Sequence, residues 1–275
     1  MFGTSSKART DRVIADVLPP VDAIAVDDGD LHVAIAGAGI TLVLLHGWTL
    51  DHRCWLPQLP LAGQARLVLP DRRGCGRSTA PSRLAEEWRD IDRLAGRERF
   101  VLVGLSQGAS VALDYARRRP DRLRALVLVG APLAALTPRE DEDEALPHAQ
   151  YAALVRDGAI AAMRRGWADH VLLRRTPRAA PLVEAMLGDY DGRDLLAPPA
   201  PIAIAADDIA ALPMPVLAIV GSDDTAWRRR VADFIAATAP QGEVRRIAGA
   251  GHLCNLDNPA RFNAVLADFL APLLD

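Results

Sequence analysis

Short, mostly apolar runs recur along this chain, a pattern typical of strands that are buried on both faces of a parallel sheet. The runs occupy residues 41–45, 65–70, 100–103, 123–129 and 216–220. Segments with helical spacing lie between or after them, at residues 84–94, 109–119 and 227–239. Because strands that alternate with helices form right-handed crossovers, the pattern predicts an α/β fold with a mostly parallel central sheet flanked by helices.

The two ends of this pattern are also distinctive. Residues 21–26 and 31–36 flank a turn signal at 27–30, which predicts an antiparallel hairpin before the parallel strands. Residues 243–247 predict a last strand, and a closing helix is expected to begin near Asn258 and Pro259. The apolar residues of that helix have helical spacing and are predicted to be core: Phe262, Val265, Leu266, Phe269, Leu270 and Leu273.

The character of the chain changes between residues 133 and 212. Helical Ala- and Arg-rich segments punctuated by prolines replace the strand-like runs, which predicts a mostly helical insertion at 133–212. The core is then formed by residues 21–132 and 213–275, after a polar N-terminal extension at 1–20. We interpret the acidic run from Glu140 to Glu144 as a solvated face.

Composition narrows the classes of partner. The 275 residues include 32 Lys and Arg against 35 Asp and Glu, a net charge of -3, which favours a small-molecule partner over nucleic acid or an anionic membrane. Lys7 is the only lysine, which excludes a Schiff base at a core lysine. With no signal-peptide h-region and no bilayer-length apolar run, we expect a cytoplasmic protein.

No cofactor or metal is predicted from the cysteines and histidines. Cys54, Cys75 and Cys254 lack the spacing of a disulfide framework or a zinc site, and we interpret them as packed, reduced thiols. His32, His52, His148 and His170 have no motif around them and are assigned to the surface or to satisfied core positions.

The clearest candidate for chemistry follows the apolar run at 100–103. That run leads into Gly104-Leu-Ser-Gln-Gly108 and then into a helical segment, which is a G-x-S-x-G motif in a strand-turn-helix setting. A turn this sharp strains the serine backbone and leaves no space for side chains at the flanking glycines. The motif predicts an exposed Ser106 hydroxyl; the alternative is a glycine turn with an incidental serine.

A serine hydroxyl is a weak nucleophile and needs a base beside it. Asp224 follows the strand at 216–220, and His252 lies in a glycine-flanked loop after the next strand. Because the carboxyl ends of parallel strands converge on one edge of a sheet, we expect both side chains to approach Ser106. Asp223 is an alternative to Asp224, since the local register decides which carboxylate faces the histidine.

Several segments together resemble the α/β-hydrolase superfamily. They are His46-Gly47, Asp71-x-Arg-Gly-x-Gly-x-Ser78, Gly104-x-Ser-x-Gly108, Gly221-x-x-Asp224, and Gly251-His252 followed by Asn258-Pro259. These motifs occur in the family's order and span roughly residues 21–275. Two features depart from many members: Ala109 replaces a further glycine, and residues 81–99 are short for their helix.

The resemblance implies a role for each matching residue. Ser106 corresponds to the nucleophile, His252 to the general base and acid, and Asp224 to the group that orients the imidazole. The backbone N–H groups of Trp48 and Gln107 correspond to the oxyanion hole. The insertion at 133–212 corresponds to a cap domain, His46 to a structural residue, and Asp71 and Ser78 to braces of their turn.

The implied activity is hydrolysis of a small ester or lactone through an acyl-enzyme. A serine rather than an aspartate at the nucleophile position argues against haloalkane dehalogenase and epoxide hydrolase chemistry, and the C-terminal tail is similar to enol-lactonases and small carboxylesterases. The alternatives are a carbon–carbon bond hydrolase acting on vinylogous diketones, a thioesterase or acyltransferase, and a ligand-binding protein with low turnover. The insertion also offers arginines for a substrate carboxylate: Arg164, Arg165, Arg174 and Arg175.

Overall fold

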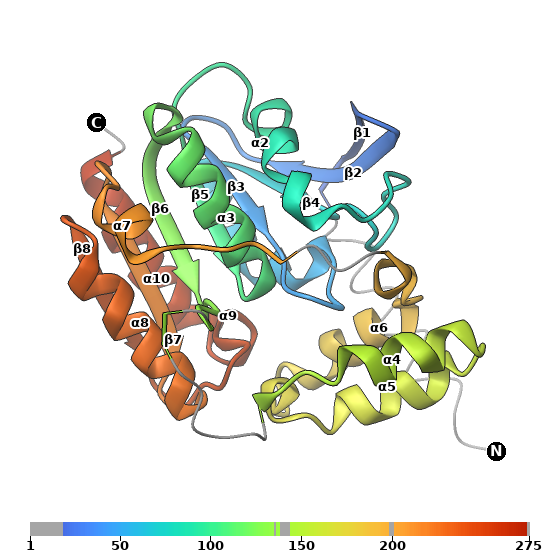
Figure 1. Cartoon of the computed structure of the whole chain (residues 1–275). Coiled ribbons are helices and arrows are strands. Elements are labelled where there is room, and N and C mark those ends of the chain that lie inside the picture. The colour runs from blue at the N-terminus through green and yellow to red at the C-terminus, as the bar shows by residue number, and fades with distance from the viewer. Residues whose placement is uncertain (1–18, 135, 138–143, 198–200, 274–275) are drawn as a thin grey trace.

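A computed structural model describes residues 19–134, 136–137, 144–197 and 201–273. One eight-stranded sheet has the order β1-β2-β4-β3-β5-β6-β7-β8. The strands are β1 (Val21–Val26), β2 (Gly29–Ala36), β3 (Thr41–Leu45), β4 (Arg66–Pro70), β5 (Phe100–Leu105), β6 (Leu123–Val129), β7 (Val216–Gly221) and β8 (Gly242–Ile247). The β1–β2 hairpin is antiparallel and joins β4 in antiparallel pairing, whereas β4, β3 and β5 to β8 run parallel (Figure 1). The predicted α/β class is therefore confirmed.

Helices connect and cover these strands. The α-helices are α2 (Trp88–Ala95), α3 (Gln107–Arg118), α4 (His148–Arg156), α5 (Ile160–Ala168), α6 (Ala180–Asp189), α7 (Ala206–Ala210), α8 (Ala226–Thr238), α9 (Cys254–Asp257) and α10 (Pro259–Leu270). The 3₁₀ helices are η1 (His52–Gly63), η2 (Leu84–Glu86), η3 (Pro120–Arg122), η5 (Val171–Leu173), η6 (Arg193–Leu196) and η7 (Ala271–Leu273). In the part of the chain that the structure describes, no helix is both long enough and apolar enough to cross a bilayer.

Alternating residues of the buried strands form two separate cores. In β3, Leu42 and Leu44 pack on the face covered by η1 and α10, and Val43 and Leu45 pack on the face covered by α2, α3, α7 and α8. The closing helix contributes its predicted core residues, of which Phe262, Val265, Leu266 and Leu270 are buried. The sheet is thus the middle layer of three, with helices packed on both of its faces. This packing fixes the positions of the strand ends.

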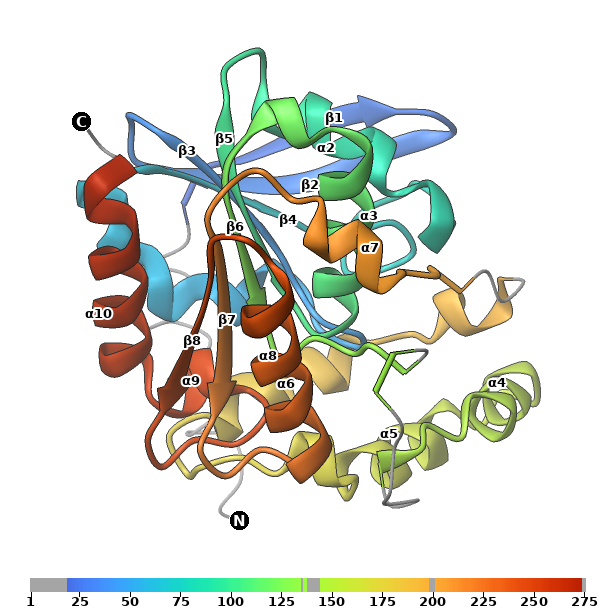
Figure 2. The same ribbon diagram turned by 60° about the vertical axis from the view of Figure 1, so that its left-hand side comes forward.

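The chain between β6 and β7 contains helices α4 to α7, and most of them lie at one end of these layers. Helices α4, α5 and α6 lie beyond the carboxyl ends of β6 and β7 in both ribbon views (Figures 1 and 2). Helix α7, from the same stretch, instead packs beside α3 and α8 against the sheet. The helices that lie over the strand ends are therefore α4 to α6.

The long 3₁₀ helix η1 has no counterpart in the sequence-based prediction. It contains Pro57 and Pro60, which interrupt the hydrogen-bonding pattern of an α-helix and hide the helical periodicity. It is anchored by Trp55, which is fully buried, and by Asn255, whose side-chain amide donates to the Cys54 carbonyl at 2.8 Å. A distant loop therefore stabilises this segment.

The loop after β3 is held by a buried, neutral histidine. The Nδ1 atom of His46 lies 2.7 Å from the Gly47 carbonyl, and its Nε2 atom accepts from the Arg72 backbone N–H at 2.8 Å. One nitrogen must donate and the other accept, which only the neutral imidazole does. Burial and the positive charge of Arg72 lower the pKa of His46 to about 4. The contacts assign His46 a structural role.

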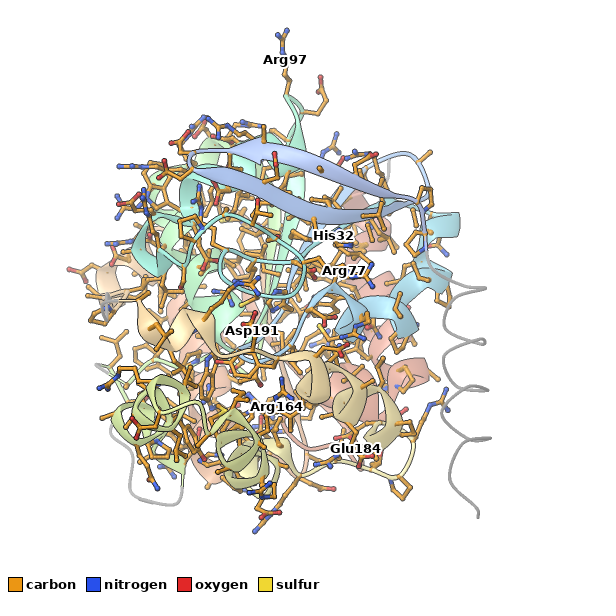
Figure 3. The ribbon with its side chains drawn as sticks, turned by 90° about the vertical axis from the view of Figure 1, so that its right-hand side faces the viewer. His32, Arg77, Arg97, Arg164, Glu184 and Asp191 are labelled. Atoms are coloured by element: carbon orange, nitrogen blue, oxygen red, sulfur yellow. The ribbon has the colours of Figure 1, made fainter. Side chains whose placement is uncertain are left out.

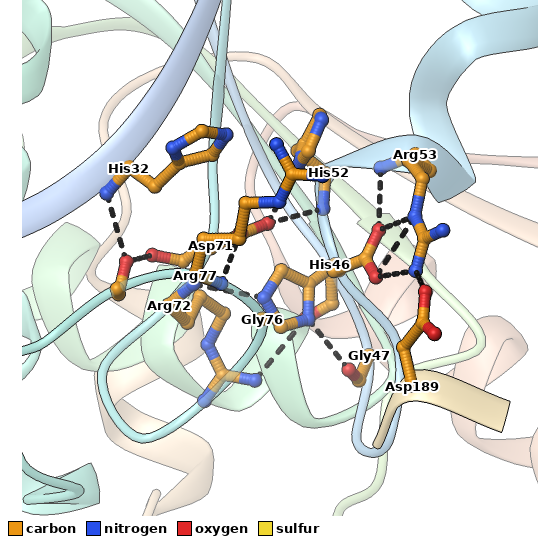
Figure 4. A network of polar contacts seen from close by, with 12 residues as sticks. His32, His46, Gly47, His52, Arg53, Asp71, Arg72, Gly76, Arg77 and Asp189 are labelled. Carbon is orange, nitrogen blue, oxygen red and sulfur yellow. Dashed lines mark hydrogen bonds and ion pairs between the residues drawn. The ribbon is translucent and has the colours of Figure 1, made fainter. Parts of the chain in front are cut away.

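The loop after β4 is braced by Asp71, as Figure 4 shows. Its carboxylate accepts from the backbone N–H and the Nδ1 of His52, at 2.8 and 2.7 Å, and from the Arg77 backbone N–H at 2.7 Å. The Ser78 hydroxyl donates to the Asp71 carbonyl at 2.6 Å. Burial alone raises the pKa of Asp71, but the bonds and charge of His52 prevail and lower it to about 2. Asp71 and Ser78 thus hold the turn together.

The turn from β5 into α3 is strained at Ser106, which has φ 52° and ψ -115°. The Ser106 N–H donates to the Val129 carbonyl at 2.8 Å, which ties the turn to the neighbouring strand. A Cβ atom at Gly104 would lie 2.4 Å from the Gly108 carbonyl oxygen, and one at Gly108 would lie 2.6 Å from the His46 carbonyl oxygen. Both flanking glycines are therefore required by the close approach of backbone atoms.

The variant Gly104→Ala tests this crowding. Because backbone rather than a flexible side chain occupies the space, we expect the free energy of unfolding to fall by about 2 kcal/mol or more. Gly63→Ala is the matched control, since a Cβ atom there meets nothing within 4 Å. Urea denaturation measures both; equal stabilities of the two variants would contradict the crowding argument.

The buried His46 predicts a pH-dependent stability. Because its pKa is about 4 in the folded chain and 6.5 as its ordinary value, the unfolded chain alone takes up this proton between those pH values. The resulting contribution is present above pH 6.5 and is lost as the pH falls toward 4, by about 3 kcal/mol. Urea titrations from pH 7 to 4 should show a weaker decline in His46→Gln, which keeps an acceptor for Arg72. An identical decline in both proteins would refute the assignment.

Candidate active site

A cavity of about 190 Å³ lies between the carboxyl end of the sheet and the helices beyond it. The polar or aromatic residues that line it are Trp48, Ser106, Gln107, Ser110, Glu144, His148, Trp167, Trp227, Arg228 and His252. Four of the predicted site residues, Ser106, His252, Trp48 and Gln107, are in this set. The structure therefore brings together residues from the loops after β3, β5 and β8, as the convergence of parallel strands requires.

Asp224, the fifth predicted residue, lies behind the histidine. Its Oδ2 atom is 3.0 Å from the Nδ1 atom of His252, and the two residues are 4% and 5% exposed. The other oxygen of the carboxylate accepts from the Thr225 backbone N–H at 2.8 Å. Asp223 is exposed and accepts from the Ser222 hydroxyl at 2.9 Å. The carboxylate that contacts the imidazole is therefore that of Asp224.

The environment of Asp224 favours its charged form. Burial by itself raises the pKa of this carboxyl, but the positive charge and hydrogen bond of His252 and the charge of Arg228 prevail and lower it. An ionised carboxylate accepts from the Nδ1 atom of the imidazole and leaves Nε2 available for chemistry on the other side of the ring. Gly130, with φ 53°, allows this packing, because a Cβ atom there would lie 2.7 Å from the imidazole of His252.

The two residues predicted to offer backbone N–H groups, Trp48 and Gln107, line the same cavity as Ser106. Gln107 is the first residue of α3, so its N–H belongs to the first turn, where the amides have no intrahelical acceptor. The positive end of the helix dipole lies at the same place and favours negative charge there. Trp48 lies in the loop that His46 holds, and it forms part of the cavity wall.

Aromatic residues from α4 to η6 pack on Trp48. The ring centroid of Trp48 is 4.8 Å from those of His148 and of Trp167, and its Nε1 atom donates to Asp194 at 2.8 Å. Tyr190 donates to the other oxygen of Asp194 at 2.6 Å, and burial raises the pKa of the Asp194 carboxyl. Asp194 is not predicted from the sequence, because it lies in no motif and its partner Trp48 is 146 residues away.

The prediction that the acidic run is solvated is wrong for Glu144. This residue is 2% exposed, accepts from the Thr225 hydroxyl at 2.5 Å and forms an ion pair with Arg228. Residues 140–143 lie outside the described residues. Runs of like charge are usually exposed, and only the packing of α8 against this segment reveals a buried partner for the last member.

None of the four arginines proposed for a substrate carboxylate lines the cavity that contains Ser106. Arg164, on α5 (Figure 3), donates to the Tyr190 carbonyl at 2.8 Å, and Arg175 pairs with Glu184 at 3.1 Å. Arg165 is exposed, and Arg174 lines a separate cavity of about 450 Å³. The arginine in the wall of the Ser106 cavity is Arg228.

One group of residues has the side chains of a metal site. Potential ligand atoms of His32, His52 and Asp71 lie within 4.8 Å of one another. Both oxygens of Asp71 already accept hydrogen bonds from His52 and Arg77. Burial lowers the pKa of His32, and the charges of His52 and Arg77 act in the same direction. These contacts explain the group as a brace of the loop after β4.

The three cysteines are buried, as expected for packed thiols. Burial raises the pKa of Cys54, of Cys75 and of Cys254 well above its ordinary value. The protonated thiol is a poor nucleophile and a poor metal ligand. The three thiols are therefore poor candidates for nucleophilic attack, whereas Ser106 and His252 both line the cavity.

Comparison with known proteins adds a family to this geometry. The model of the alpha/beta hydrolase family matches residues 42–265. A pimeloyl-[acyl-carrier protein] methyl ester esterase of Edwardsiella ictaluri is 32% identical over 83% of this chain and 92% of its own length. A 2-hydroxymuconate semialdehyde hydrolase of Pseudomonas sp. (strain CF600) is 29% identical, with 86% and 88% covered.

A solved structure gives the same result. A thermophilic esterase from Thermogutta terrifontis superimposes with a TM-score of 0.80 and 25% identity, and covers 93% of this chain and 100% of the esterase. The residues that the family model matches, 42–265, extend from β3 to β8 and so include the strands whose ends contribute to the cavity. By the match of its sequence and of its fold, the chain belongs to the alpha/beta hydrolase family.

Proposed function

We propose that this protein is a serine hydrolase that cleaves a small ester or lactone through an acyl-enzyme. The proposal is carried by one observation: a strained turn holds Ser106 in the same cavity as His252, whose imidazole contacts a buried carboxylate at 3.0 Å. A hydroxyl, a base and a group that orients the base are the elements of nucleophilic catalysis by serine.

The reaction begins when Ser106 attacks the carbonyl carbon and His252 takes the hydroxyl proton. Asp224 holds the imidazole in the tautomer with hydrogen on Nδ1 and stabilises the imidazolium that forms. As the tetrahedral intermediate collapses, the imidazolium gives its proton to the leaving oxygen. Water then attacks the acyl-enzyme by the same route, which releases the acid and restores Ser106.

The backbone N–H groups of Trp48 and Gln107 are proposed to receive the negative charge on the carbonyl oxygen. Each such donor contributes about 3 kcal/mol to stabilisation of the transition state. The dipole of α3 adds to this effect, because the oxyanion forms at its N-terminus. The loop that His46 and Asp71 brace holds Trp48 in place, so the hydrogen bonds described above serve the reaction indirectly.

The cavity points to a small, uncharged acyl group. Its volume of about 190 Å³ is below the range of about 300–1,000 Å³ that is typical of pockets for drug-sized ligands. Its apolar wall consists of Leu50, Leu105, Pro132, Leu146, Leu172, Leu173 and Leu253. We propose that the helical segment at 133–212, through α4 to α6, acts as the cap that excludes water from this space.

Carbon–carbon bond hydrolysis is the second candidate, supported by the similarity to the 2-hydroxymuconate semialdehyde hydrolase. The ester reaction is favoured, because both the relative at 32% identity and the superimposed structure are esterases. A thioesterase or acyltransferase would use the same three residues, and a ligand-binding protein on this scaffold would show little turnover. Product analysis by mass spectrometry separates these reactions.

Labelling with a fluorophosphonate probe tests the nucleophile. We expect one adduct, located on Ser106 by peptide mapping, and none in Ser106→Ala, which should keep the thermal melting temperature of the wild type. Ester turnover should fall by about 10⁴-fold or more in this variant, because the attacking group is lost. An adduct on another residue, or full activity of the variant, would overturn the proposal.

Acyl-chain length tests the size of the cavity. We expect p-nitrophenyl acetate and butyrate to be hydrolysed with a higher kcat/KM than the octanoate, since a longer chain does not fit the described space. Leu173→Ala removes part of the cavity wall and so enlarges the cavity. In this variant, the highest kcat/KM should move toward esters with longer acyl chains. A wild-type preference for octanoate would contradict the assigned substrate size.

A further inference from the structure

The wall of the cavity that contains Ser106 and His252 also holds a second buried pair, formed by Glu144 and Arg228. The Arg228 Nε atom donates to one carboxylate oxygen of Glu144, and the Thr225 hydroxyl donates to the other at 2.5 Å. The side chains are 2% and 5% exposed. Glu144 comes from the segment before α4, whereas Thr225 and Arg228 come from the start of α8, so the pair joins the helical insertion to the core.

Arg228 also contacts the surroundings of the histidine. Its Nη1 atom donates to the Gly130 carbonyl at 2.8 Å, and Gly130 packs against the imidazole of His252. Its guanidinium lies 4.8 Å from the ring centroid of Trp227, in a cation–π contact. The positive charge of Arg228 is near enough to Asp224 to favour the ionised carboxylate.

The carboxylates of Glu144 and Asp224 are therefore both stabilised by the positive charge of the buried Arg228. Glu144 binds Arg228 directly, and Asp224 binds His252. A buried charge that loses its partner is strongly destabilised, because neither water nor another group compensates it. Without Glu144, Arg228 would lose this carboxylate partner, and Asp224 is another carboxylate within reach of its charge. A contact between Arg228 and Asp224 would compete with the bond from Asp224 to His252.

We propose that Glu144 is a positioning residue, which holds Arg228 so that Asp224 remains directed at His252. The inference rests on the proposed function of Ser106, His252 and Asp224, and it assigns Glu144 no contact with the reacting atoms. This role explains why a glutamate from the insertion is buried beside the core. It also means that the orientation of His252 depends on how the insertion packs against the core.

The charges around His252 give the direction of the effect. The titratable or charged groups that lie near it are Asp224, Arg228, Glu144, His170 and Cys254. Removing the negative charge of Glu144 leaves the positive charge of Arg228 less compensated, which disfavours the protonated imidazole. A turn of Arg228 toward Asp224 acts in the same direction, because it neutralises the carboxylate that stabilises the imidazolium.

Glu144→Gln is the central variant, because the amide keeps an acceptor but removes the charge. We expect kcat for p-nitrophenyl acetate to fall about tenfold, as for the loss of a hydrogen bond to a charged group. The acidic arm of the pH–activity curve should move about half a unit to lower pH. A purely structural contact would lower the melting temperature and leave that arm in place.

Two further variants complete the experiment. Glu184→Gln removes another glutamate–arginine pair of the insertion, in which Glu184 is 63% exposed, and should leave both kcat and the pH curve unchanged. Glu144→Asp keeps the charge, so the acidic arm should return to the wild-type position. If Glu144→Gln does not melt cooperatively, Glu144→Met, which fills a similar volume, replaces it.

An NMR titration of the imidazole of His252 separates this inference from the proposed function, because it needs no substrate. A lower titration midpoint in Glu144→Gln than in Glu184→Gln supports the role of Glu144. If wild-type Ser106 takes no fluorophosphonate, the proposed function fails, whereas the titration still tests Glu144. Identical midpoints and identical pH curves in the wild type and Glu144→Gln would overturn the inference.

Discussion

The turn between β5 and α3 is the constraint on which the rest of the site depends. Ser106 has a positive φ that a residue with a side chain rarely adopts, and the backbone passes so closely at Gly104 and Gly108 that neither position has space for a Cβ atom. The backbone keeps this strained conformation because the buried strand β5 and the helix α3 fix the chain on either side of Ser106. The same turn lifts the serine out of the sheet and places the helix N-terminus beside it.

Buried polar groups hold the loops around this turn. Both ring nitrogens of His46 form hydrogen bonds, one as donor and one as acceptor, so the imidazole must be neutral. The Asp71 carboxylate accepts hydrogen bonds from three N–H groups, which requires its charged form. The pKa of each moves in the corresponding direction, to about 4 and to about 2. The Trp48 loop is thus stabilised by hydrogen bonds rather than by regular secondary structure, and its precision depends on complete pairing of those groups.

The helices beyond the strand ends contribute both walls and charges. Trp167 and Leu173 narrow the cavity, Asp194 fixes the ring of Trp48, and Glu144 reaches the core through Arg228. The small volume and the buried ion pair therefore have the same origin, which is the close packing of this segment on the sheet. A family member with another segment in this place would keep the turn and the histidine but present a different space to its substrate.

The sequence by itself determined the α/β class with its mostly parallel sheet, the turn at Ser106 and the positions of Asp224 and His252 at strand ends. Those features follow from periodicity and from glycines within a few residues of each other, which are local properties. The tertiary structure decided between Asp223 and Asp224 and buried Glu144 in an apparently solvated run. It also left the four arginines proposed for a substrate carboxylate out of the cavity wall, and it formed η1 around two prolines. Each of these depends on which distant side chain lies opposite, and a linear pattern does not contain that information.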